Sequence, residues 1–390
     1  MNKPKYILSA SGKFSYFEIG RILQERNQLV KIITGHPGIK LRKEKIPRNF
    51  YIANGIFNML VYPFLSSTQF KSFIDLMWIL NKKNIDRLTC NFLDKNDDAD
   101  VLLGLSGVSL NSAKKMMGKN KIFVCDRTSS HIVYQNNLLA EEYKINNRKY
   151  FKTHNWFLDN EVKEYEMADI ILVPSNFVKN SFGKELIKKV KVINFGVNTQ
   201  NFFKDFNIKK SEKYFDILFI GQISLRKGLH YLIDAFHKFK HPNKRLHIVG
   251  SHTLDKDFFE EKIKHDKIIY YGHVNHLKLN NIMNKSHIFV IPSIEEGFAT
   301  VILQAIAAGC PVIVSENTGA SEYVENNKCG YSVPIRDVDA ITDKLEIVAE
   351  NNDLLNEFSN NATRCTQNNT WSDYVDKLDK IIEEHKNNTI

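Results

Sequence analysis

The sequence predicts an α/β fold with two doubly wound domains, each built on a parallel sheet, and a cleft between them. The chain has 390 residues, which is enough for two domains of ordinary size. Short apolar runs alternate with helical patterns, and this alternation starts afresh after a polar, basic join at residues 195–214. Because strand–helix–strand repetition is typical of a doubly wound parallel sheet, two such series predict two such domains.

The predicted strands are apolar at nearly every position, as expected for parallel strands covered on both faces. They lie at 5–10, 29–34, 100–105, 121–126, 169–174 and 190–195 in the first half, and at 215–221, 245–250, 267–272, 287–292 and 311–316 in the second. Ligands of open α/β sheets bind at the carboxyl ends of the strands. Residues that directly follow a strand are therefore the candidates for a binding site.

Helical segments fit between these strands. In the segment after residue 228, one apolar stripe recurs at helical spacing, formed by Leu229, Leu232, Ile233 and Phe236. The tail is an amphipathic helix that opens at a Thr370 or Ser372 cap. We therefore expect an N-terminal domain over 1–200, a C-terminal domain over 201–370 and a final helix over 371–390 that packs back on the N-terminal domain.

The positive charge is concentrated in the first half. The formal net charge is +10 overall, and residues 1–200 carry 31 Lys and Arg against 18 Asp and Glu. Such asymmetry indicates an anionic partner for that half, or a lysine-rich face that only keeps the protein in solution. Nucleic acid is not favoured, since no finger, basic helix or base-stacking aromatic motif occurs.

The remaining composition argues against several classes of protein. The five cysteines are scattered with no Cys-x-x-Cys, which is typical of reduced cytosolic thiols rather than a disulfide frame or zinc site. The N-terminus is too polar for a signal peptide, and no apolar run is long enough to span a bilayer. The most apolar stretch, residues 55–65, is predicted to be a buried loop or strand rather than a patch that touches a membrane.

Two loops of the second half contain residues that could bind an anionic ligand. After strand 215–221 come Arg226 and Lys227, at the mouth of a helix that begins near Gly228. A helix N-terminus favours anions, and a guanidinium beside an ammonium makes a diphosphate site. Two solvated surface cations are the alternative.

After strand 287–292, Glu296 lies in a turn, and a helix begins near Ala299 or Thr300. Gln304 shares one helix face with Thr300 and interrupts an apolar helix, so we expect it to be buried and hydrogen-bonded. It can bind ribose hydroxyls, or it can be a structural glutamine tied to the backbone.

In the first half, Asp126, Arg127 and His131 cluster after strand 121–126. They are candidates for the opposite side of the cleft, although a lone histidine is often structural.

These segments together resemble the retaining GT-B glycosyltransferases of family 4, nucleotide-sugar enzymes of the glycosyl transferases group 1. "FIGQISLRKGLHYLIDAF" is similar to the diphosphate-binding segment of that family, "PSIEEGFATVILQAIAAGCPVI" to its Glu-x7-Glu segment, and "NTGASEYV" to its Gly-Gly-Glu loop. In the first half "CDRTSSHIVYQNNLLAEEY" and "ADIILVPSNFVKNSF" also resemble the family, as does "FGVNTQNF", its interdomain hinge.

The resemblance implies two Rossmann-like domains and a role for each matched residue. Glu296 would hold the donor sugar, and His131 would donate to the sugar or phosphate from the N-terminal domain. Arg226 and Lys227 would stabilise the leaving diphosphate, together with backbone at the strand and helix ends. The diphosphate set is Gly221, Arg226, Lys227, Phe298, Ala299 and Thr300; the ribose and sugar set is Glu296, Gly297 and Gln304; and further candidates are Gly12, Asp126, Arg127 and Gly319.

Three positions depart from the family pattern. The second glutamate of the motif is Gln304, which keeps an acceptor but loses a charge-assisted bond. The motif arginine falls at Gln222, so Arg226 would take over its phosphate role. The N-terminal Gly-Gly loop is reduced to Ser11-Gly12.

No cofactor and no metal are expected, because two cations on the diphosphate would make a metal dispensable. Two Asp-x-Asp sequences, 98–100 and 255–257, are interpreted as solvated carboxylates rather than metal ligands.

The implied reaction is the transfer of a sugar, a hexose by analogy, from a UDP- or GDP-sugar to a glycan or lipid-linked acceptor. Front-face attack would retain the anomeric configuration, as in bacterial cell-surface polysaccharide or lipopolysaccharide synthesis. The basic N-terminal half would bind the acceptor and contact the anionic inner face of the cytoplasmic membrane.

The alternatives are a nucleotide-sugar epimerase or another GT-B enzyme such as a phosphorylase, and a non-enzymatic protein that binds an anionic ligand. An oxidoreductase is not favoured, because no Gly-x-Gly-x-x-Gly follows the first strand.

Overall fold

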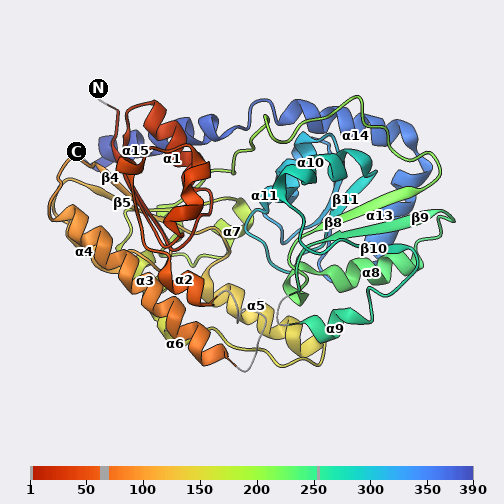
Figure 1. Ribbon diagram of the computed structural model, residues 1–390, viewed down its shortest axis with the longest axis horizontal. Coiled ribbons are helices and arrows are strands. Elements are labelled where there is room, and N and C mark those ends of the chain that lie inside the picture. Colours follow the sequence, from red (N-terminus) through yellow and green to blue (C-terminus); the bar gives the residue numbers. More distant parts are fainter. Residues whose placement is uncertain (1–2, 62–69, 253–254, 390) are drawn as a thin grey trace. The chain divides into compact units, whose positions relative to one another are not determined.

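The computed structural model describes residues 3–61, 70–252 and 255–389. These residues form two compact units (Figure 1). The first unit comprises Met1–Asn136, Phe151–Asn194 and Trp371–Ile390, and the second comprises Asn137–Tyr150 and Phe195–Thr370. The chain thus changes unit at residues 194–195, and Asn137–Tyr150 belongs to the second unit although the sequence-based boundary placed it in the first.

The first unit is built on a seven-stranded sheet in the order β3-β2-β1-β4-β5-β6-β7, in which every pairing is parallel. Its strands are β1 (Tyr6–Ala10), β2 (Leu29–Thr34), β3 (Tyr51–Ala53), β4 (Val101–Leu105), β5 (Ile122–Asp126), β6 (Ile170–Val173) and β7 (Val190–Val192). Strands β1 and β4 are buried at every position. The unit therefore matches the doubly wound parallel sheet that the apolar runs predict.

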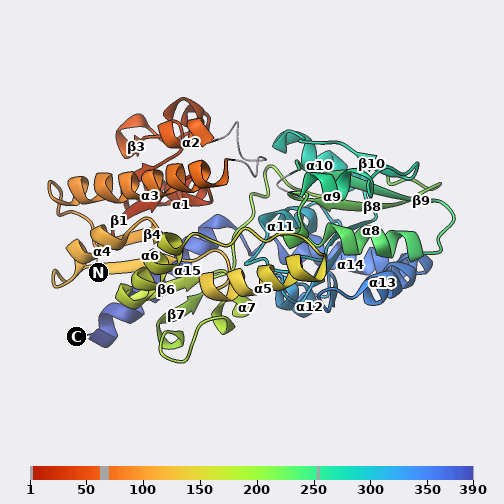
Figure 2. The same ribbon diagram turned by 90° about the horizontal axis from the view of Figure 1, so that it is seen from below.

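The helices of the first unit connect these parallel strands. They are α1 (Tyr16–Glu25), α2 (Ile56–Val61), α3 (Lys71–Leu93), α4 (Leu110–Met116), α6 (Asn155–Met167) and α7 (Asn176–Asn180), while α5 (Ile132–Ile145) begins in this unit and continues into the second. Helix α3 contacts both α2 and α4 (Figure 2).

The C-terminal helix α15 (Trp371–Thr389) is part of the first unit and packs on α1 (Figure 1). The Tyr6 hydroxyl on β1 donates to Asp379 Oδ1 at 2.6 Å. At the end of α1, Arg26 Nη1 lies 2.7 Å from Asp376 Oδ1. These contacts join the last helix to the first strand and first helix of the chain.

The second unit has a six-stranded parallel sheet in the order β10-β9-β8-β11-β12-β13. Its strands are β8 (Phe215–Ile220), β9 (Lys244–Val249), β10 (Ile268–Tyr270), β11 (Ile288–Ile291), β12 (Val312–Ser315) and β13 (Gly330–Val333). The strand order reverses between β8 and β11, which makes their carboxyl ends the topological switch point where open α/β sheets bind ligands.

Seven α-helices lie wholly within the described part of the second unit. They are α8 (Leu229–Lys238), α9 (Lys256–Glu260), α10 (His276–Lys285), α11 (Thr300–Ala307), α12 (Ser321–Asn326), α13 (Val338–Glu350) and α14 (Asn352–Cys365). The predicted stripe on α8 is confirmed, since Leu229, Leu232, Ile233 and Phe236 are all buried. Helix α8 packs on α13, and α10 packs on α11 (Figure 1).

The prediction for residues 55–65 is wrong where the structure describes them. Residues Ile56–Val61 form helix α2, in which Ile56, Met59 and Leu60 are 58%, 58% and 49% exposed. The segment lies on the surface because only Asn58 and Val61 of this helix are buried. Residues 62–65 lie outside the described part of the chain.

Candidate functional site

The loop after β8 carries the two predicted cations. A 3-10 turn, Leu225–Lys227, ends at Gly228, which has φ +68° and opens α8. A Cβ atom at Gly228 would lie 1.9 Å from the carbonyl oxygen of Pro292. Only glycine allows both this left-handed backbone and this close approach. The β8 loop is therefore pressed against the segment that follows β11.

Backbone hydrogen bonds join three loops at the carboxyl ends of β8, β11 and β12. The Ile294 amide donates to the Arg226 carbonyl at 2.9 Å. The Glu296 amide donates to the Asn317 carbonyl at 3.0 Å, and the Gly319 amide donates to the Glu296 carbonyl at 2.8 Å. Because backbone atoms make these contacts, Glu296 is held in place whatever its side chain binds.

Four charged side chains form a cluster at this switch point. Arg226 Nε lies 3.0 Å from Glu295 Oε2, and Arg226 Nη2 lies 3.3 Å from Glu296 Oε2. Lys227 forms an ion pair with Glu296. The Glu295 side chain is fully buried, whereas Arg226 remains 27% exposed. The structure thus brings together the three residues on which the sequence-based site depends.

The pKa values of the two cations in the cluster are shifted in opposite directions. Burial lowers the pKa of Lys227, and the neighbouring Arg226 lowers it further, against the opposing effect of Glu296. Burial also works against charge on Arg226, but Glu296 and Glu295 outweigh it and raise the pKa of that guanidinium. An incoming anion would stabilise the charge on Lys227 in place of Glu296.

Helix α11 supplies the other predicted donor contacts. Its N-cap residue, Ala299, provides no side-chain hydrogen bond to the first turn, and Thr300 is exposed. Phe298 is 1% exposed and packs against the rings of Phe195 and Tyr323, so it supports the start of α11 rather than presenting its ring to a ligand. The N-terminal amides of α11 are therefore a candidate anion contact.

The expectation that Gln304 is buried and hydrogen-bonded is wrong. Its side chain is partly exposed. The side-chain amide makes no hydrogen bond to the residues that the structure describes. A structural tie to the backbone is therefore absent within that part of the chain, and the amide can accept and donate to a ligand.

Gly221 directly follows β8 and lies beside the same cluster. Its amide donates to the Val249 carbonyl at 3.0 Å. A Cβ atom at Gly221 would lie 3.9 Å from Lys227 Cδ, so the aliphatic part of the lysine passes close to this glycine.

In the first unit, the segment after β5 holds His131, Asp126 and Arg127. The Val133 amide donates to His131 Nδ1 at 3.3 Å. Burial lowers the pKa of His131, and Arg127 lowers it further. The imidazole is therefore neutral near pH 7, with Nδ1 as an acceptor and the proton on Nε2.

Arg127 and Asp126 are buried in the first unit. Arg127 Nη1 lies 2.8 Å from Glu161 Oε2, and Arg127 Nη2 donates to Gln135 Oε1 at 2.9 Å. Asp126 is 2% exposed. Arg127 thus holds the His131 segment in place rather than standing free for a ligand. Gly12 follows β1, and its carbonyl accepts from the Thr34 hydroxyl at 2.8 Å.

Sequence reasoning missed two carboxylates that position the site. Glu295 orients Arg226. Its position next to Glu296 in the sequence was the one feature that could have indicated this role. Asp255 Oδ2 accepts from the Leu225 amide at 3.1 Å and from the Tyr143 hydroxyl at 2.8 Å. Asp255 is 2% exposed, so its interpretation as a solvated carboxylate is wrong. It holds the turn that presents Arg226.

Among the described residues, no group of three histidine, cysteine, aspartate or glutamate side chains is arranged to hold a metal ion. In the same residues, no helix combines the length and the apolar character needed to cross a membrane.

Solved structures share the fold of the two units. Sucrose-phosphate synthase from Thermosynechococcus elongatus superimposes with a TM-score of 0.71 at 15% identity, over 98% of this chain and 99% of that one. Anabaena Alr3699/HepE, solved in complex with UDP and glucose, gives a TM-score of 0.66 at 14% identity, over 98% and 100%. The two parallel-sheet units thus have the GT-B glycosyltransferase fold, as the sequence predicts.

The family assignment rests on the second unit. Residues 200–365 match the family Glycosyl transferases group 1, and they contain the whole Arg226–Glu296 cluster. The chain therefore carries a region that matches the glycosyl transferases group 1 family, the broad group that its motifs resemble.

Curated relatives share this part of the chain. The uncharacterized glycosyltransferase MJ1607 of Methanocaldococcus jannaschii is 32% identical over 45% of this chain and 50% of its own length. The capsular polysaccharide biosynthesis glycosyltransferase CapM of Staphylococcus aureus is 28% identical over 58% of this chain and 64% of its own length. The chain thus spans between half and two thirds of these relatives.

Proposed function

We propose that this protein transfers a sugar from a nucleoside diphosphate sugar to a glycan or lipid-linked acceptor and retains the anomeric configuration. The observation that carries the proposal is the Arg226–Lys227–Glu296 cluster at the switch point of the second sheet. A group that binds two adjacent cations there must carry concentrated negative charge, which a diphosphate does. The Alr3699/HepE structure, which holds UDP and glucose on the same fold, supports this ligand class.

The chemistry requires the bond between the sugar C1 and the diphosphate oxygen to break. Negative charge then grows on the leaving diphosphate, and positive charge grows on the sugar ring. Arg226, Lys227 and the N-terminal amides of α11 would stabilise the first charge without a change in the backbone of the β8 and β11 loops, which hydrogen bonds between those loops hold in place. Glu296 would bind the sugar hydroxyls and face the positive ring, and Gln304 would bind the ribose.

We propose that His131 acts as an uncharged hydrogen-bond donor. Its proton lies on Nε2, so it would donate to a sugar hydroxyl or a phosphate oxygen without adding charge. The two cations take the role that a divalent metal has in other transferases, so we propose a metal-independent reaction.

The acceptor would bind the first unit, near an anionic membrane surface. Exposed apolar side chains lie beside exposed lysines there: Ile39 is 81% exposed and Met59 58%, and Lys40 and Lys43 are also exposed. A Cβ atom at Gly55 would lie 2.5 Å from Pro37, which places the start of α2 against the start of the segment with these lysines. Apolar side chains with nearby lysines suit an interface with anionic lipid.

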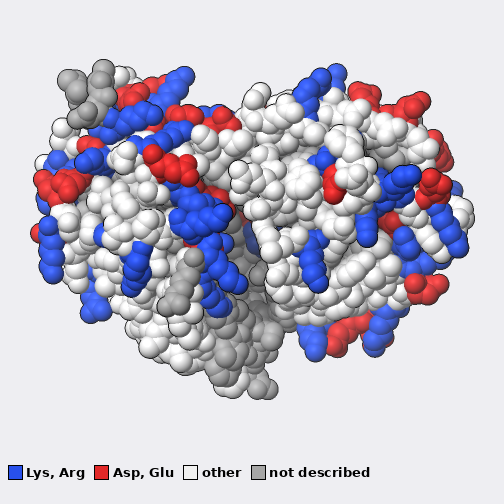
Figure 3. Space-filling model, turned by 45° about the horizontal axis from the view of Figure 1, so that its top comes forward, with Lys and Arg blue, Asp and Glu red and all other residues white. Residues whose placement is uncertain are grey.

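Charged groups on the face drawn in Figure 3 are mixed, with Asp and Glu among the Lys and Arg. We propose that the membrane contact depends on the apolar side chains together with the lysines rather than on charge alone. Flotation with phosphatidylglycerol vesicles tests it: Met59→Glu should abolish binding, and Leu277→Glu, at a 77% exposed site of the second unit, should not. Unchanged flotation of Met59→Glu would contradict the membrane contact but leave the sugar transfer standing.

The transfer itself is tested by a thermal-shift screen against nucleotides and UDP- and GDP-sugars, with and without EDTA. A hit is then incubated with candidate acceptors, and the anomeric configuration of the product is read by NMR. Transfer with retention supports the proposal. An epimerised nucleotide sugar, or a sugar phosphate formed with inorganic phosphate, would instead identify an epimerase or a phosphorylase.

A further inference from the structure

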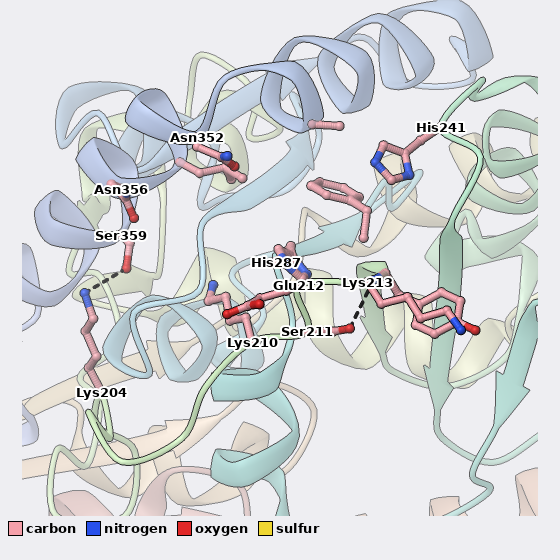
Figure 4. Close-up of a pocket in the computed structure, with 14 residues that line it drawn as sticks. Lys204, Lys210, Ser211, Glu212, Lys213, His241, His287, Asn352, Asn356 and Ser359 are labelled. Atoms are coloured by element: carbon pink, nitrogen blue, oxygen red, sulfur yellow. Dashed lines mark hydrogen bonds between the residues drawn. The ribbon is translucent and has the colours of Figure 1, made fainter.

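A polar cavity of about 770 Å³ lies in the second unit, away from the Arg226–Glu296 cluster (Figure 4). Its walls come from the segment before β8, from the start of β8 and from α14. Phe215, the first residue of β8, lines this cavity, whereas the Arg226 loop follows Ile220, the last residue of the strand. Because a six-residue strand is roughly 17 Å long, the cavity and the cluster are separate sites.

The cavity carries an excess of positive charge. Lys204, Lys210 and Lys213 line it, and Glu212 is the one carboxylate among the lining residues. None of the three lysines forms an ion pair with a carboxylate of the described residues, Glu212 included. Lys204 instead donates to Ser359 Oγ at 3.1 Å (Figure 4). A cavity of this kind attracts an anion that its own side chains do not supply.

Two groups in the cavity have no hydrogen-bond partner among the described residues, the partly exposed ammonium of Lys210 and the buried Nδ1 of His241. The ammonium group of Lys210 makes no hydrogen bond to the described residues. Burial lowers its pKa, and Lys204 lowers it further. His241 Nδ1 is buried with no hydrogen-bond partner among the same residues. Because an unsatisfied buried polar atom is costly, His241 Nδ1 indicates a ligand. The partly exposed ammonium of Lys210 is available to bind its anionic group.

The opposite wall offers neutral polar groups. Asn352, Asn356 and Ser359 line it from α14, spaced so that they lie on one face of the helix. Figure 4 shows these three side chains on the α14 side and Lys210 and His287 on the other. Amide and hydroxyl groups of this kind suit the hydroxyls of a carbohydrate.

From this arrangement we propose that the cavity binds a phosphorylated sugar. Its phosphate would lie against Lys210 and Lys204, and its hydroxyls would face Asn352 and Asn356. The volume falls in the range of small-molecule sites. The ligand would connect the segment before β8 with α14, and so it should stabilise the second unit independently of the donor nucleotide.

Isothermal titration calorimetry of the full chain with glucose 6-phosphate tests the proposal. We expect binding that persists in saturating UDP, weakens at least tenfold in Lys210→Met, and is unchanged in the control Lys256→Ala, whose side chain is 61% exposed on α9. Glu212→Gln removes the one acidic group of the cavity and should tighten binding, a gain that misfolding cannot produce.

Inorganic phosphate and glucose serve as separate ligands in the same experiment. Weaker binding of phosphate and no binding of glucose are expected, because the cavity offers contacts to both ends of the ligand. Equal affinity for phosphate and glucose 6-phosphate would overturn the sugar part of the proposal. Displacement by UDP, or equal affinity in wild type, Lys210→Met and Glu212→Gln, would overturn the site.

Discussion

Lys227 and Glu296 form an ion pair in which each side chain is only 12% exposed, and Arg226 approaches the same Glu296 oxygen at 3.3 Å. The carboxylate therefore satisfies both cations when no ligand is bound. Under the proposed function, a donor diphosphate would compete with Glu296 for Lys227, and this competition would release the carboxylate toward the sugar. The pair would thus link recognition of the diphosphate to the position of the acidic group.

The first prediction separates binding from turnover at Glu296. Glu296→Ala should lower turnover at least about a hundredfold, the scale for losing one preorganised stabiliser. The same change should leave UDP affinity unchanged or tighter, since it removes a negative charge that competes for Lys227 and Arg226. Steady-state kinetics and calorimetry with UDP measure the two effects. Weaker UDP binding together with full turnover would contradict the assignment.

The second prediction concerns the proton of Lys227. Lys227→Ala should lower turnover at least about a hundredfold and weaken UDP binding. In the wild type, burial lowers the pKa of this lysine, and a bound diphosphate raises it again, so donor binding at alkaline pH should take up a proton. Calorimetry at pH 9 in two buffers of different ionisation enthalpy measures this uptake. It should disappear in Lys227→Ala and persist in Lys256→Ala.

The third prediction addresses Gln304, whose amide faces no partner among the described residues. Gln304→Glu introduces the carboxylate of the family pattern, and a charged acceptor binds ribose hydroxyls more strongly than an amide does. UDP affinity should be maintained or increased. A calorimetric titration in which Gln304→Glu loses UDP binding would remove this residue from the ribose role.

The fourth prediction concerns the approach of the β8 loop to Pro292. Gly228→Ala adds a Cβ atom 1.9 Å from the Pro292 carbonyl oxygen and also strains a left-handed backbone. Gly272→Ala is a matched control in the same unit, since Gly272 has φ +64° but no atom near its Cβ position. The control should cost roughly 1 kcal/mol of stability. Gly228→Ala should cost clearly more in thermal unfolding and should also weaken UDP binding. Equal costs would show that the close approach is unimportant.

Much of the fold was predictable because parallel strands buried on both faces are continuous apolar runs. Strands β3 and β13 were missed, and both lie at the edge of a sheet, where burial is incomplete. In β13, Tyr331 and Ser332 are only partly buried, so the apolar signal is interrupted. The sequence pattern reports burial, and in these two strands half-covered positions interrupt it.

The sequence predicted which loops form the candidate site, but not every side chain that holds it together. Arg226, Lys227 and Glu296 directly follow neighbouring strands, so strand order alone brings them to the switch point. The roles of Glu295 and Asp255 were not predictable. Which of two adjacent glutamates turns inward depends on the local backbone, and the contact of Asp255 with Leu225 joins residues 30 positions apart.

The last prediction uses the buried Asp126 at the end of β5. Burial raises its pKa to about 7, against the opposing effect of the Tyr16 hydroxyl, whereas an unfolded aspartate titrates near about 3.9. Since the folded pKa is the higher one, the stability that this group contributes is fully present below about pH 4 and is lost as the pH rises through about 7.

Asp126→Asn cannot ionise, so the free energy of unfolding of the variant relative to wild type should increase between pH 5 and pH 8, by an amount on the order of 3 kcal/mol. Urea unfolding at a series of pH values measures the difference. Glu164 in the same unit, whose pKa burial raises to about 8, titrates in both proteins and therefore cancels. Asp98→Asn, at an exposed site, is the control and should show no pH-dependent difference. A constant difference for Asp126→Asn across this range would mean that Asp126 is already ionised in the folded protein at pH 5.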